Sequence, residues 1–350
     1  MRAVWISDTF EQLNGVATYI KSTVPLLKKR IDVELYTGRV KKKYDFPIRS
    51  IPNFPAPFQS DYDIIIPNFR RIKADIMHVH TAYSLGLYSS MLPTKKVVTT
   101  HLHPYHLLEG MFGSNQPKIL QKFAWKFVVS FFNRFDVVVC QTNATKEMYK
   151  EQGLRARAEV IPNGMDISHS VESYVPKVHF REKYGIKGDF AFFLGRIDAS
   201  KGIDWVIDVA EKMHDKEFVI VGKGTMESKI PKRDNIHYFK YLDHEDKEAA
   251  FSECAMMLMP SWVETEGIVA QEAMLFKKPV LVSTNPVLKE VVGRGGIPCR
   301  NVEELIEKTR YLFDDAQARA EIGEKALEEV KKRDINLSVE KLIKVYESLV

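Results

Sequence analysis

The stretch AMMLMPSWVETEGIVAQEAM, residues 255–274, decides the fold class. It begins with an apolar run that is typical of a strand buried on both faces. After a short polar loop it continues as a helix, which we expect to begin near Gly267. The same order of apolar run, loop and longer amphipathic segment recurs along the chain, and this alternation indicates βαβ units. We therefore predict an α/β protein with doubly wound, Rossmann-like parallel sheets.

The alternation divides the 350 residues into two halves. The expected strands are 3–7, 33–37, 76–80, 96–101, 136–141 and 159–163 in the first half, and 190–195, 217–222, 236–241, 255–260 and 278–283 in the second. Periodicity is poor between Gly164 and Tyr184, so we place the linker there. The predicted domains are residues 1–168 and 169–336, and a last helix at about 337–350 either ends the second domain or returns to the first.

The composition is that of a soluble globular protein, with 45% hydrophobic and 28% charged residues. No uncharged apolar run reaches about 18 residues, so we expect no membrane-spanning helix. Residues 2–6 have the pattern of a strand and lack the features of a signal peptide. Cys140, Cys254 and Cys299 form no close pair and are expected to be reduced, mostly buried thiols. These features predict a cytoplasmic protein.

The net charge of +5 is distributed unevenly along the chain. Residues 1–168 hold 23 Lys and Arg against 14 Asp and Glu, whereas residues 169–350 hold 28 against 32. A basic first half is typical of a protein that meets phosphate, nucleic acid or an anionic membrane surface. An ordinary solvated surface would show the same asymmetry, so the charge alone does not select a partner.

Ligands of open α/β sheets bind beyond the carboxyl ends of the strands. Gly15 opens a helix after the first strand, where backbone N–H groups can approach a phosphate, although a plain turn is the alternative. A GxGxxG fingerprint is missing there, which argues against a dinucleotide site. His101 stands at a strand tip, within reach of a ligand. Arg196 and Lys201 flank a polar turn before a helix, which predicts either an anion cradle or a solvated loop.

The quoted stretch places Glu264 in the loop and Glu272 in the second turn of its helix. Eight helical positions span roughly 12 Å, about the length from a hexose across a diphosphate to a ribose. Carboxylates accept hydrogen bonds from hydroxyls, so each acid is a candidate sugar ligand. The free N–H groups between them, at Gly267, Ile268 and Val269, would face the diphosphate. Pairing with the helix dipole is an alternative for Glu264, but it does not explain Glu272.

We predict no metal site. The spacing of His101, His103 and His106 matches no standard zinc motif, and no cysteine joins them. The triplet Asp61-Tyr62-Asp63 has the form of a metal-binding DxD, but it lies in a Pro-rich loop and is interpreted as a helix start.

Several motifs, taken in chain order, resemble the family 4 retaining glycosyltransferases, also called glycosyltransferase group 1. They are Asn14-Gly15-Val16, HVHTAYSLG (78–86), VVTTH (97–101), VIPNGMD (160–166), FLGRIDASKG (193–202), VGKG (221–224) and Glu264 with Glu272. The resemblance covers nearly the whole chain. It implies the GT-B fold, in which two Rossmann-like domains face a central cleft.

The resemblance also implies an activity and its residues. The expected enzyme is a retaining, metal-independent hexosyltransferase that needs no cofactor and takes its sugar from a nucleotide diphosphate donor, UDP-glucose or a similar compound. The implied roles are Gly15 at the donor phosphates, Arg196 and Lys201 at the diphosphate leaving group, Glu264 at the transferred sugar, Glu272 at the ribose, His101 beside the sugar, and the backbone near Tyr241 and Leu242 at the base.

Two features favour a lipid acceptor over a soluble sugar. Thr265 and Glu266 replace the Gly and Phe that many members carry, and such forms resemble glycosyltransferases of diacylglycerol and related lipids. The segment 118–135 has a stripe of cations at Lys118, Lys122, Lys126 and Arg134 among apolar residues. Such a helix can lie on an anionic membrane, or it can pack on the sheet with its lysines in water. We therefore expect no nucleic-acid partner and a peripheral position on the inner face of the cell membrane.

Three other functions are alternatives to transfer. A nucleotide-sugar epimerase would share the GT-B fold and the donor site. A non-catalytic protein could bind the nucleotide sugar at a membrane surface without turnover. An oxidoreductase is the least supported, because the glycine-rich fingerprint is missing.

Overall fold

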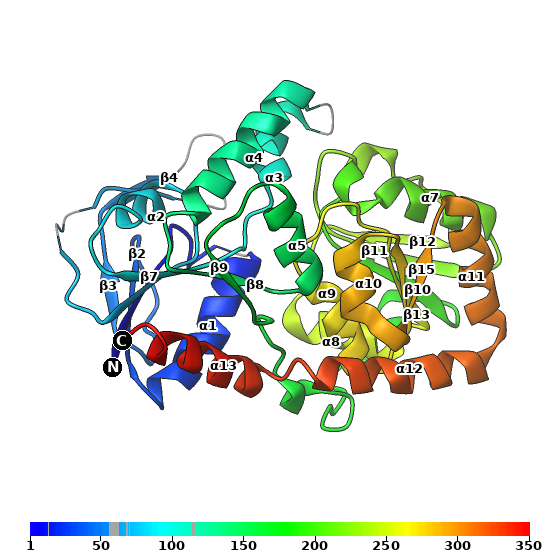
Figure 1. Ribbon diagram of the computed structural model, residues 1–350. Helices are drawn as coiled ribbons and strands as arrows, with labels where there is room; N and C mark the ends of the chain where they lie inside the picture. Colours follow the sequence, from blue (N-terminus) through cyan, green and yellow to red (C-terminus); the bar gives the residue numbers. More distant parts are fainter. Residues whose placement is uncertain (13, 56–62, 68, 70, 114–115) are drawn as a thin grey trace. The chain divides into compact units, whose positions relative to one another are not determined.

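The computed structural model describes residues 1–12, 14–55, 63–67, 69, 71–113 and 116–350. Its chain forms two compact units (Figure 1). Unit 1 comprises Met1–Gly164 and Ile335–Val350, and unit 2 comprises Met165–Asp334. The chain therefore enters unit 2 once, and its last helix, α13 (Ile335–Glu347), belongs to unit 1.

Unit 1 is built on a seven-stranded parallel sheet with the order β3-β2-β1-β6-β7-β8-β9. Its strands are β1 (Arg2–Ile6), β2 (Asp32–Thr37), β3 (Ile48–Ser50), β6 (Ile76–Val79), β7 (Lys95–Thr99), β8 (Val137–Cys140) and β9 (Arg157–Val160). In the central register Ala3 of β1 pairs with Val33 on one side and with Ile76 on the other. A separate antiparallel pair consists of β4 (Asn53–Pro55) and β5 (Asp63–Ile65).

Helices cover both faces of this sheet, because the side chains of each strand alternate between the faces. The helices are α1 (Gly15–Lys28), α2 (Ser84–Ser89), α3 (Pro104–Phe112), α4 (Lys118–Phe132), α5 (Asn143–Glu151) and α13. Trp5 of β1 joins the core cluster that α1 and α13 complete with Leu27 and Leu342. Its neighbour Ile6 joins the opposite cluster, where α4 contributes Val128.

A buried polar network fastens α13 to the sheet of unit 1. The Trp5 indole N–H donates to the Tyr346 hydroxyl over 3.0 Å, and that hydroxyl lies 2.6 Å from His78 Nδ1. His78 Nε2 in turn lies 2.7 Å from Thr99 Oγ1 on β7. Burial lowers the pKa of His78 well below its usual range, so the imidazole is neutral. The terminal helix is thus held by specific hydrogen bonds as well as by apolar packing.

Unit 2 is built on a six-stranded parallel sheet with the order β12-β11-β10-β13-β14-β15. Its strands are β10 (Phe190–Leu194), β11 (Glu217–Val221), β12 (Ile236–Phe239), β13 (Met256–Met259), β14 (Val280–Ser283) and β15 (Gly296–Cys299). Its helices are α6 (Phe180–Tyr184), α7 (Ile203–Lys212), α8 (His244–Glu253), α9 (Ile268–Leu275), α10 (Pro286–Val292), α11 (Val302–Asp314) and α12 (Ala316–Lys331). Phe192 packs toward α8 and α9, and Phe193 packs toward α7 and α11.

Both sheets have the doubly wound strand order, so the predicted fold class is confirmed. The chain reverses its winding between β1 and β6 in unit 1, and between β10 and β13 in unit 2. Ligands of such sheets bind outside the carboxyl ends of the strands at these switch points. The loops that follow β10 and β13 are therefore the first place to look for a site in unit 2.

The structure also contains strands that the sequence pattern did not predict. All the predicted strands are present, with ends shifted by up to three residues. β3 and β15 were missed because β3 has only three residues, two of them exposed, and β15 contains Gly296 and Pro298. The helix start expected at Asp61-Tyr62-Asp63 is wrong at Asp63, which begins β5, and Asp61 and Tyr62 lie outside the described residues.

Candidate functional site

The loop that carries Arg196 is fixed against the loop after β11 by glycines. A Cβ atom on Gly222 would lie 1.8 Å from the carbonyl oxygen of Gly195, and one on Gly224 would lie 2.4 Å from that of Ile197. The close approach allows Ile197 N–H to donate to the Lys223 carbonyl over 2.9 Å. The VGKG motif therefore holds the loop after β10 in place, and it does not need to form a dinucleotide site.

Arg196 lies two residues after β10 and points its guanidinium toward Asp198, with 3.4 Å between Nη1 and Oδ2. Its side chain is 43% exposed. Asp198 is itself fixed, because its Oδ1 accepts hydrogen bonds from the Thr225 N–H and hydroxyl over 2.8 and 2.7 Å. The structure thus presents one accessible, oriented cation at the end of the first strand of unit 2.

Lys201 is brought to the neighbouring loop by a second close backbone approach. Gly202 has a φ of 67°, and a Cβ atom there would lie 2.2 Å from the carbonyl oxygen of Pro260. The Ser200 carbonyl accepts a hydrogen bond from Trp262 N–H over 2.9 Å. Lys201 therefore reaches Glu264, and Nζ lies 2.6 Å from Oε1 with the side chains only 17% and 9% exposed. The structure brings this predicted basic residue and this predicted acid together.

Gly267 is the N-cap of α9 and adopts a left-handed conformation with φ 72° and ψ 52°. The first N–H groups of a helix, here at Ile268 and Val269, have no partner within it and suit an anion. Glu272 stands in the second turn, and its Oε1 lies 2.7 Å from Lys247 Nζ of α8. Its side chain is 24% exposed. Each predicted acid is therefore paired with a lysine.

Lys247 was missed by the sequence analysis. It lies inside α8 and not directly after a strand. The rule that ligand-binding residues follow the carboxyl ends of strands therefore does not identify it. The available signal was weak: one lysine in the acidic run His244-Glu245-Asp246-Lys247-Glu248. Tyr241 and Leu242 occupy the predicted place between β12 and α8, with Tyr241 65% exposed and Leu242 buried.

The two predicted residues of unit 1 also follow strands. Gly15 begins α1 behind Asn14, whose side chain accepts a hydrogen bond from Ala17 N–H over 2.9 Å. His101 follows β7, and its Nε2 lies 3.3 Å from His80 Nδ1, while its Nδ1 lies 3.5 Å from Gln141 Nε2. Burial lowers the pKa of His101 to about 3. His101 is therefore a neutral hydrogen-bonding group and not a cation.

A buried carboxylate, Asp8, occupies the switch point of unit 1. It accepts hydrogen bonds from the Leu85 and Gly86 N–H groups over 2.6 and 3.1 Å, and from the Thr81 hydroxyl over 2.6 Å. A Cβ atom on Gly86 would lie 1.8 Å from the Thr81 carbonyl oxygen. Burial raises the pKa of Asp8. This geometry explains the motif HVHTAYSLG, because Asp8 caps the N–H groups of its last two residues at the start of α2.

No metal centre is found in the part of the chain that the structure describes, where no three His, Cys, Asp or Glu side chains converge. His103 accepts a hydrogen bond from Tyr105 N–H, and His106 pairs with Glu109 over 2.8 Å. Over the same residues, no helix is long and apolar enough to cross a membrane.

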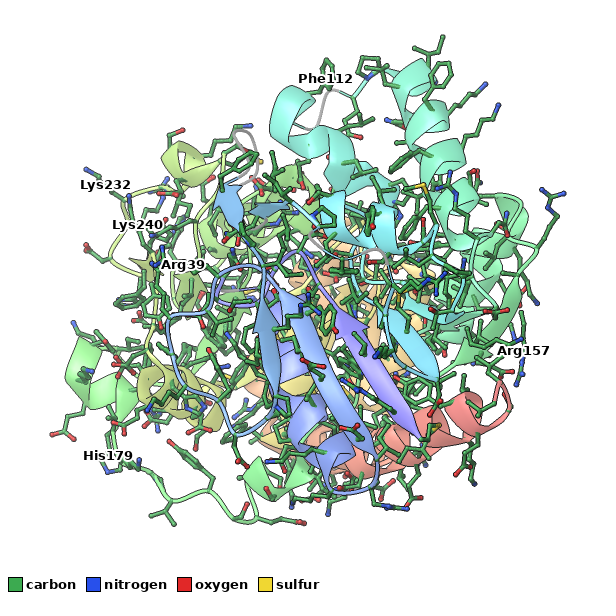
Figure 2. All side chains as sticks on the ribbon, turned by 90° about the vertical axis from the view of Figure 1, so that its left-hand side faces the viewer. Arg39, Phe112, Arg157, His179, Lys232 and Lys240 are labelled. Atoms are coloured by element: carbon green, nitrogen blue, oxygen red, sulfur yellow. The ribbon has the colours of Figure 1, made fainter. Side chains whose placement is uncertain are left out.

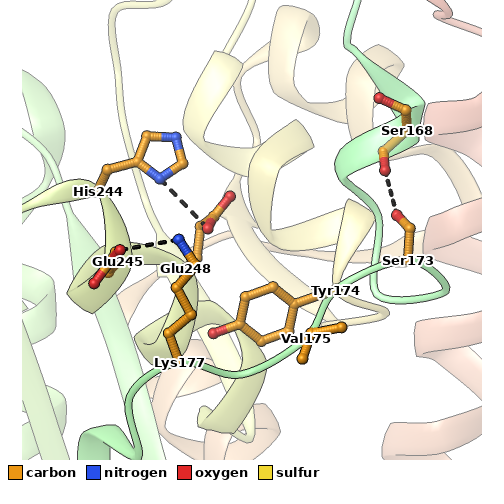
Figure 3. A pocket seen from close by; sticks show the side chains of 8 residues that line it. All are labelled: Ser168, Ser173, Tyr174, Val175, Lys177, His244, Glu245 and Glu248. Atoms are coloured by element: carbon orange, nitrogen blue, oxygen red, sulfur yellow. Dashed lines mark hydrogen bonds and ion pairs between the residues drawn. The ribbon is translucent and has the colours of Figure 1, made fainter.

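A pocket of about 510 Å³ lies beside α8 on unit 2 (Figure 3). Its lining residues are Ser168, Ser173, Tyr174, Val175, Lys177, His244, Glu245 and Glu248. Its charged groups pair with each other, Lys177 with Glu245 over 3.0 Å and His244 with Glu248 over 3.4 Å. None of the predicted donor residues after β10 and β13 lines this pocket.

Two doubly wound units, one of which carries cations and carboxylates at its switch point, define a GT-B type α/β protein. Residues 177–329 match the family Glycosyl transferases group 1, and residues 13–169 match Glycosyltransferase Family 4. The chain belongs to these family 4, group 1 glycosyltransferases and is a transferase that uses a nucleotide-sugar donor.

Known proteins agree with this membership. The chain is 28% identical over 287 residues to an uncharacterized glycosyltransferase of Methanocaldococcus jannaschii, covering 79% of this chain and 76% of that one. It is 22% identical over 323 residues to the alpha-monoglucosyldiacylglycerol synthase of Streptococcus pneumoniae, covering 83% and 73%. Among solved structures, Anabaena HepE in complex with UDP-glucose superimposes with a TM-score of 0.77 at 17% identity, covering 99% of this chain and 100% of HepE.

Proposed function

We propose that the protein is a retaining, metal-independent hexosyltransferase that uses UDP-glucose or a similar UDP-sugar. The observation that carries the proposal is the 2.6 Å contact between Lys201 and Glu264 at the switch point of unit 2. A cation for a diphosphate and a carboxylate for sugar hydroxyls stand side by side there. The UDP-glucose complex of HepE supports the choice of donor.

In the proposed reaction Arg196 and Lys201 bind the diphosphate together with the N–H groups at the start of α9. Glu264 accepts hydrogen bonds from the sugar, and Glu272 accepts them from the ribose. The bond between the anomeric carbon and the phosphate oxygen breaks, and the acceptor oxygen bonds to the same face. The acceptor proton passes to the leaving phosphate. The two cations stabilise the charge that develops on that phosphate, which is the work a metal ion does in other transferases.

We also propose roles for two residues of unit 1. Gly15 would approach a phosphate through the start of α1, and His101 would meet a sugar. Because burial keeps the pKa of His101 at about 3, it would act as a neutral hydrogen-bonding group at any physiological pH. The backbone near Tyr241 and Leu242 would contact the base.

Product analysis tests this proposal directly. The purified chain is incubated with UDP-glucose and with a lipid extract, with soluble sugars or with no acceptor, and each reaction is run with and without EDTA. We expect UDP release that depends on the acceptor and a product whose anomeric configuration is that of the donor, as seen by NMR. A changed sugar without acceptor would indicate the epimerase instead, binding without turnover would indicate the non-catalytic protein, and complete inhibition by EDTA would refute metal independence.

The proposed acceptor is a membrane lipid such as diacylglycerol, and α4 supplies the support. Its inward face is buried, but Ile119, Phe123 and Phe127 are 64%, 63% and 42% exposed. Their spacing of four places them in one row on the helix. Lys118, Lys122 and Lys126 precede them by one residue each and are also exposed. An apolar row beside a cationic row fits the interface of an anionic membrane.

Neighbouring features extend this surface of unit 1. Phe112 ends α3, which packs against α4, and its side chain projects outward with 38% exposure (Figure 2). A groove of about 350 Å³ beside the row is lined by Leu87, Phe123, Lys126, Phe127, Ser130, Phe131 and Arg134. Aromatic walls with cations beside them suit one acyl chain below an anionic headgroup. We propose a peripheral position on the inner face of the cell membrane on this basis.

Vesicle binding checks the membrane proposal. We expect the double variant Phe123→Ser/Phe127→Ser to lose at least tenfold in binding to anionic vesicles, because fully burying one Phe contributes roughly 1.5–3 kcal/mol. Wild-type binding should also fall in zwitterionic vesicles, since each lysine near an anionic surface contributes about 1 kcal/mol. Tyr311→Ser is the matched control, an exposed aromatic residue of α11 in unit 2. Equal co-sedimentation of all three proteins would contradict the proposal.

A further inference from the structure

Each acid of the proposed donor site has its own lysine. Lys201 lies 2.6 Å from Glu264, and Lys247 lies 2.7 Å from Glu272. The proposed function assigns a role to Lys201 but none to Lys247. The two pairs differ in one respect, because Lys201 ends a short 3-10 helix after β10, whereas Lys247 comes from the second turn of α8.

The contact of Lys247 orients the Glu272 side chain more than it stabilises the fold. Ion pairs with access to solvent contribute only about 0–1 kcal/mol to folding, and these side chains are 29% and 24% exposed. On α8 a more deeply buried ion pair is made by another residue, Asp246, which is 4% exposed and lies 2.7 Å from Lys183. Lys247 instead directs its ammonium group at one oxygen of a residue on the neighbouring helix.

The hydrogen bond divides the two oxygens of Glu272 into different roles. Lys247 is its hydrogen-bond partner among the described residues, and the contact is made to Oε1. Oε2 is therefore left to accept a hydrogen bond from a ligand hydroxyl. Glutamate side chains have several rotamers, so a carboxylate held at one oxygen is oriented before the ligand arrives. The ammonium group also offsets a negative charge that would otherwise repel a diphosphate nearby.

We infer that Lys247 is a positioning residue that makes this site selective for ribose over deoxyribose nucleotides. By holding Oε1 of Glu272, it aims the carboxylate at the vicinal 2′- and 3′-hydroxyls of the nucleotide. This role rests on the proposed function, because it takes from it that Glu272 binds the ribose. A site that is built to hydrogen-bond a hydroxyl rejects the analogue without it, since its polar group is then left unpaired.

Calorimetric titration with UDP, 2′-deoxy-UDP and 3′-deoxy-UDP tests the inference. We expect the native chain to prefer UDP over at least one deoxy analogue by about tenfold or more, as for a hydrogen bond to a charged group. Lys247→Met should reduce that preference to about twofold or less. Lys216→Met is the matched control, because Lys216 also pairs with an acid, Asp314 over 2.9 Å, and is 23% exposed. It should keep the native preference, and thermal unfolding verifies that each variant is folded.

A double-mutant cycle shows whether Lys247 acts through Glu272. In the Glu272→Gln background, Lys247→Met should change the preference no further. A native preference that survives Lys247→Met would overturn this role and leave the proposed function intact, as would an effect of the same size in both backgrounds. If the native chain bound no UDP at all, the proposed function would fall and this role with it.

Discussion

The variant Lys201→Met is expected to lose glycosyl transfer by about a thousandfold in kcat/KM while its fold is retained. The reason is that a preorganised cation at the leaving phosphate stabilises charge that develops only in the transition state, and removing one such group typically costs roughly 100- to 1000-fold in rate. The other lysine of the proposed site, Lys247, contacts Glu272. Steady-state kinetics with UDP-glucose measures the loss.

Stability must be separated from catalysis in this variant. Lys201 is the cation that faces the Glu264 carboxylate, which is 9% exposed, so the single change leaves a largely buried acceptor without its partner. Such a loss costs about 1–3 kcal/mol. The double variant Lys201→Met/Glu264→Gln removes the unpaired charge as well, and we expect it to melt closer to the native temperature and to remain inactive. Recovery of activity with recovered stability would show that Lys201 is only structural.

A matched control is offered by another lysine of unit 2. Lys277 lies 2.7 Å from Glu324, and its side chain is 33% exposed. Lys277→Met therefore removes a similar ion pair that lies outside the proposed donor site. We expect it to keep transfer activity within about twofold, since surface pairs of this kind contribute about 0–1 kcal/mol. Equal activity of Lys201→Met and this control would refute the site.

Residues that follow strands were predictable from the sequence, whereas Lys247, which lies inside α8, was not. Arg196, Lys201 and Glu264 follow apolar runs that could only be buried strands, and parallel strands bring their carboxyl ends to one edge of a sheet. Lys247 meets Glu272 only because α8 and α9 are neighbours in space, which no local pattern shows. The pairing of lysines with acids therefore depends on the three-dimensional arrangement of the helices.

The same limit applies to unit 1. His101 was predicted from its place at a strand tip, but its contacts with His80 and Gln141 depend on strand order. The return of α13 to unit 1 was one of two open alternatives. Trp5 and Tyr346 are 341 residues apart in the sequence. The buried hydrogen bond between them places α13 in unit 1. Long-range polar contacts of this kind leave no periodic signal in the chain.

Glu264→Gln is expected to affect UDP and UDP-glucose in opposite directions. The Glu264 carboxylate lies 2.6 Å from the Lys201 ammonium group and so competes with a diphosphate for it. The amide carries no charge and ends this competition, so we expect UDP to bind about three- to tenfold more tightly, as for a change of roughly 1 kcal/mol at a solvent-shielded pair.

Transfer should nevertheless fall by about a hundredfold in the same variant, because a charged acceptor of hydrogen bonds from the sugar is replaced by a neutral one. Calorimetry with UDP and steady-state kinetics with UDP-glucose provide the two readouts, and Glu324→Gln, which removes an acid paired at 2.7 Å outside the site, is the control. If Glu264→Gln weakened UDP binding as much as transfer, Glu264 would have to contact the nucleotide. If UDP binding did not change, the pair seen here would not restrain Lys201. Tighter UDP binding with lost transfer is the combination that requires Glu264 to bind the sugar and Lys201 to bind the phosphate.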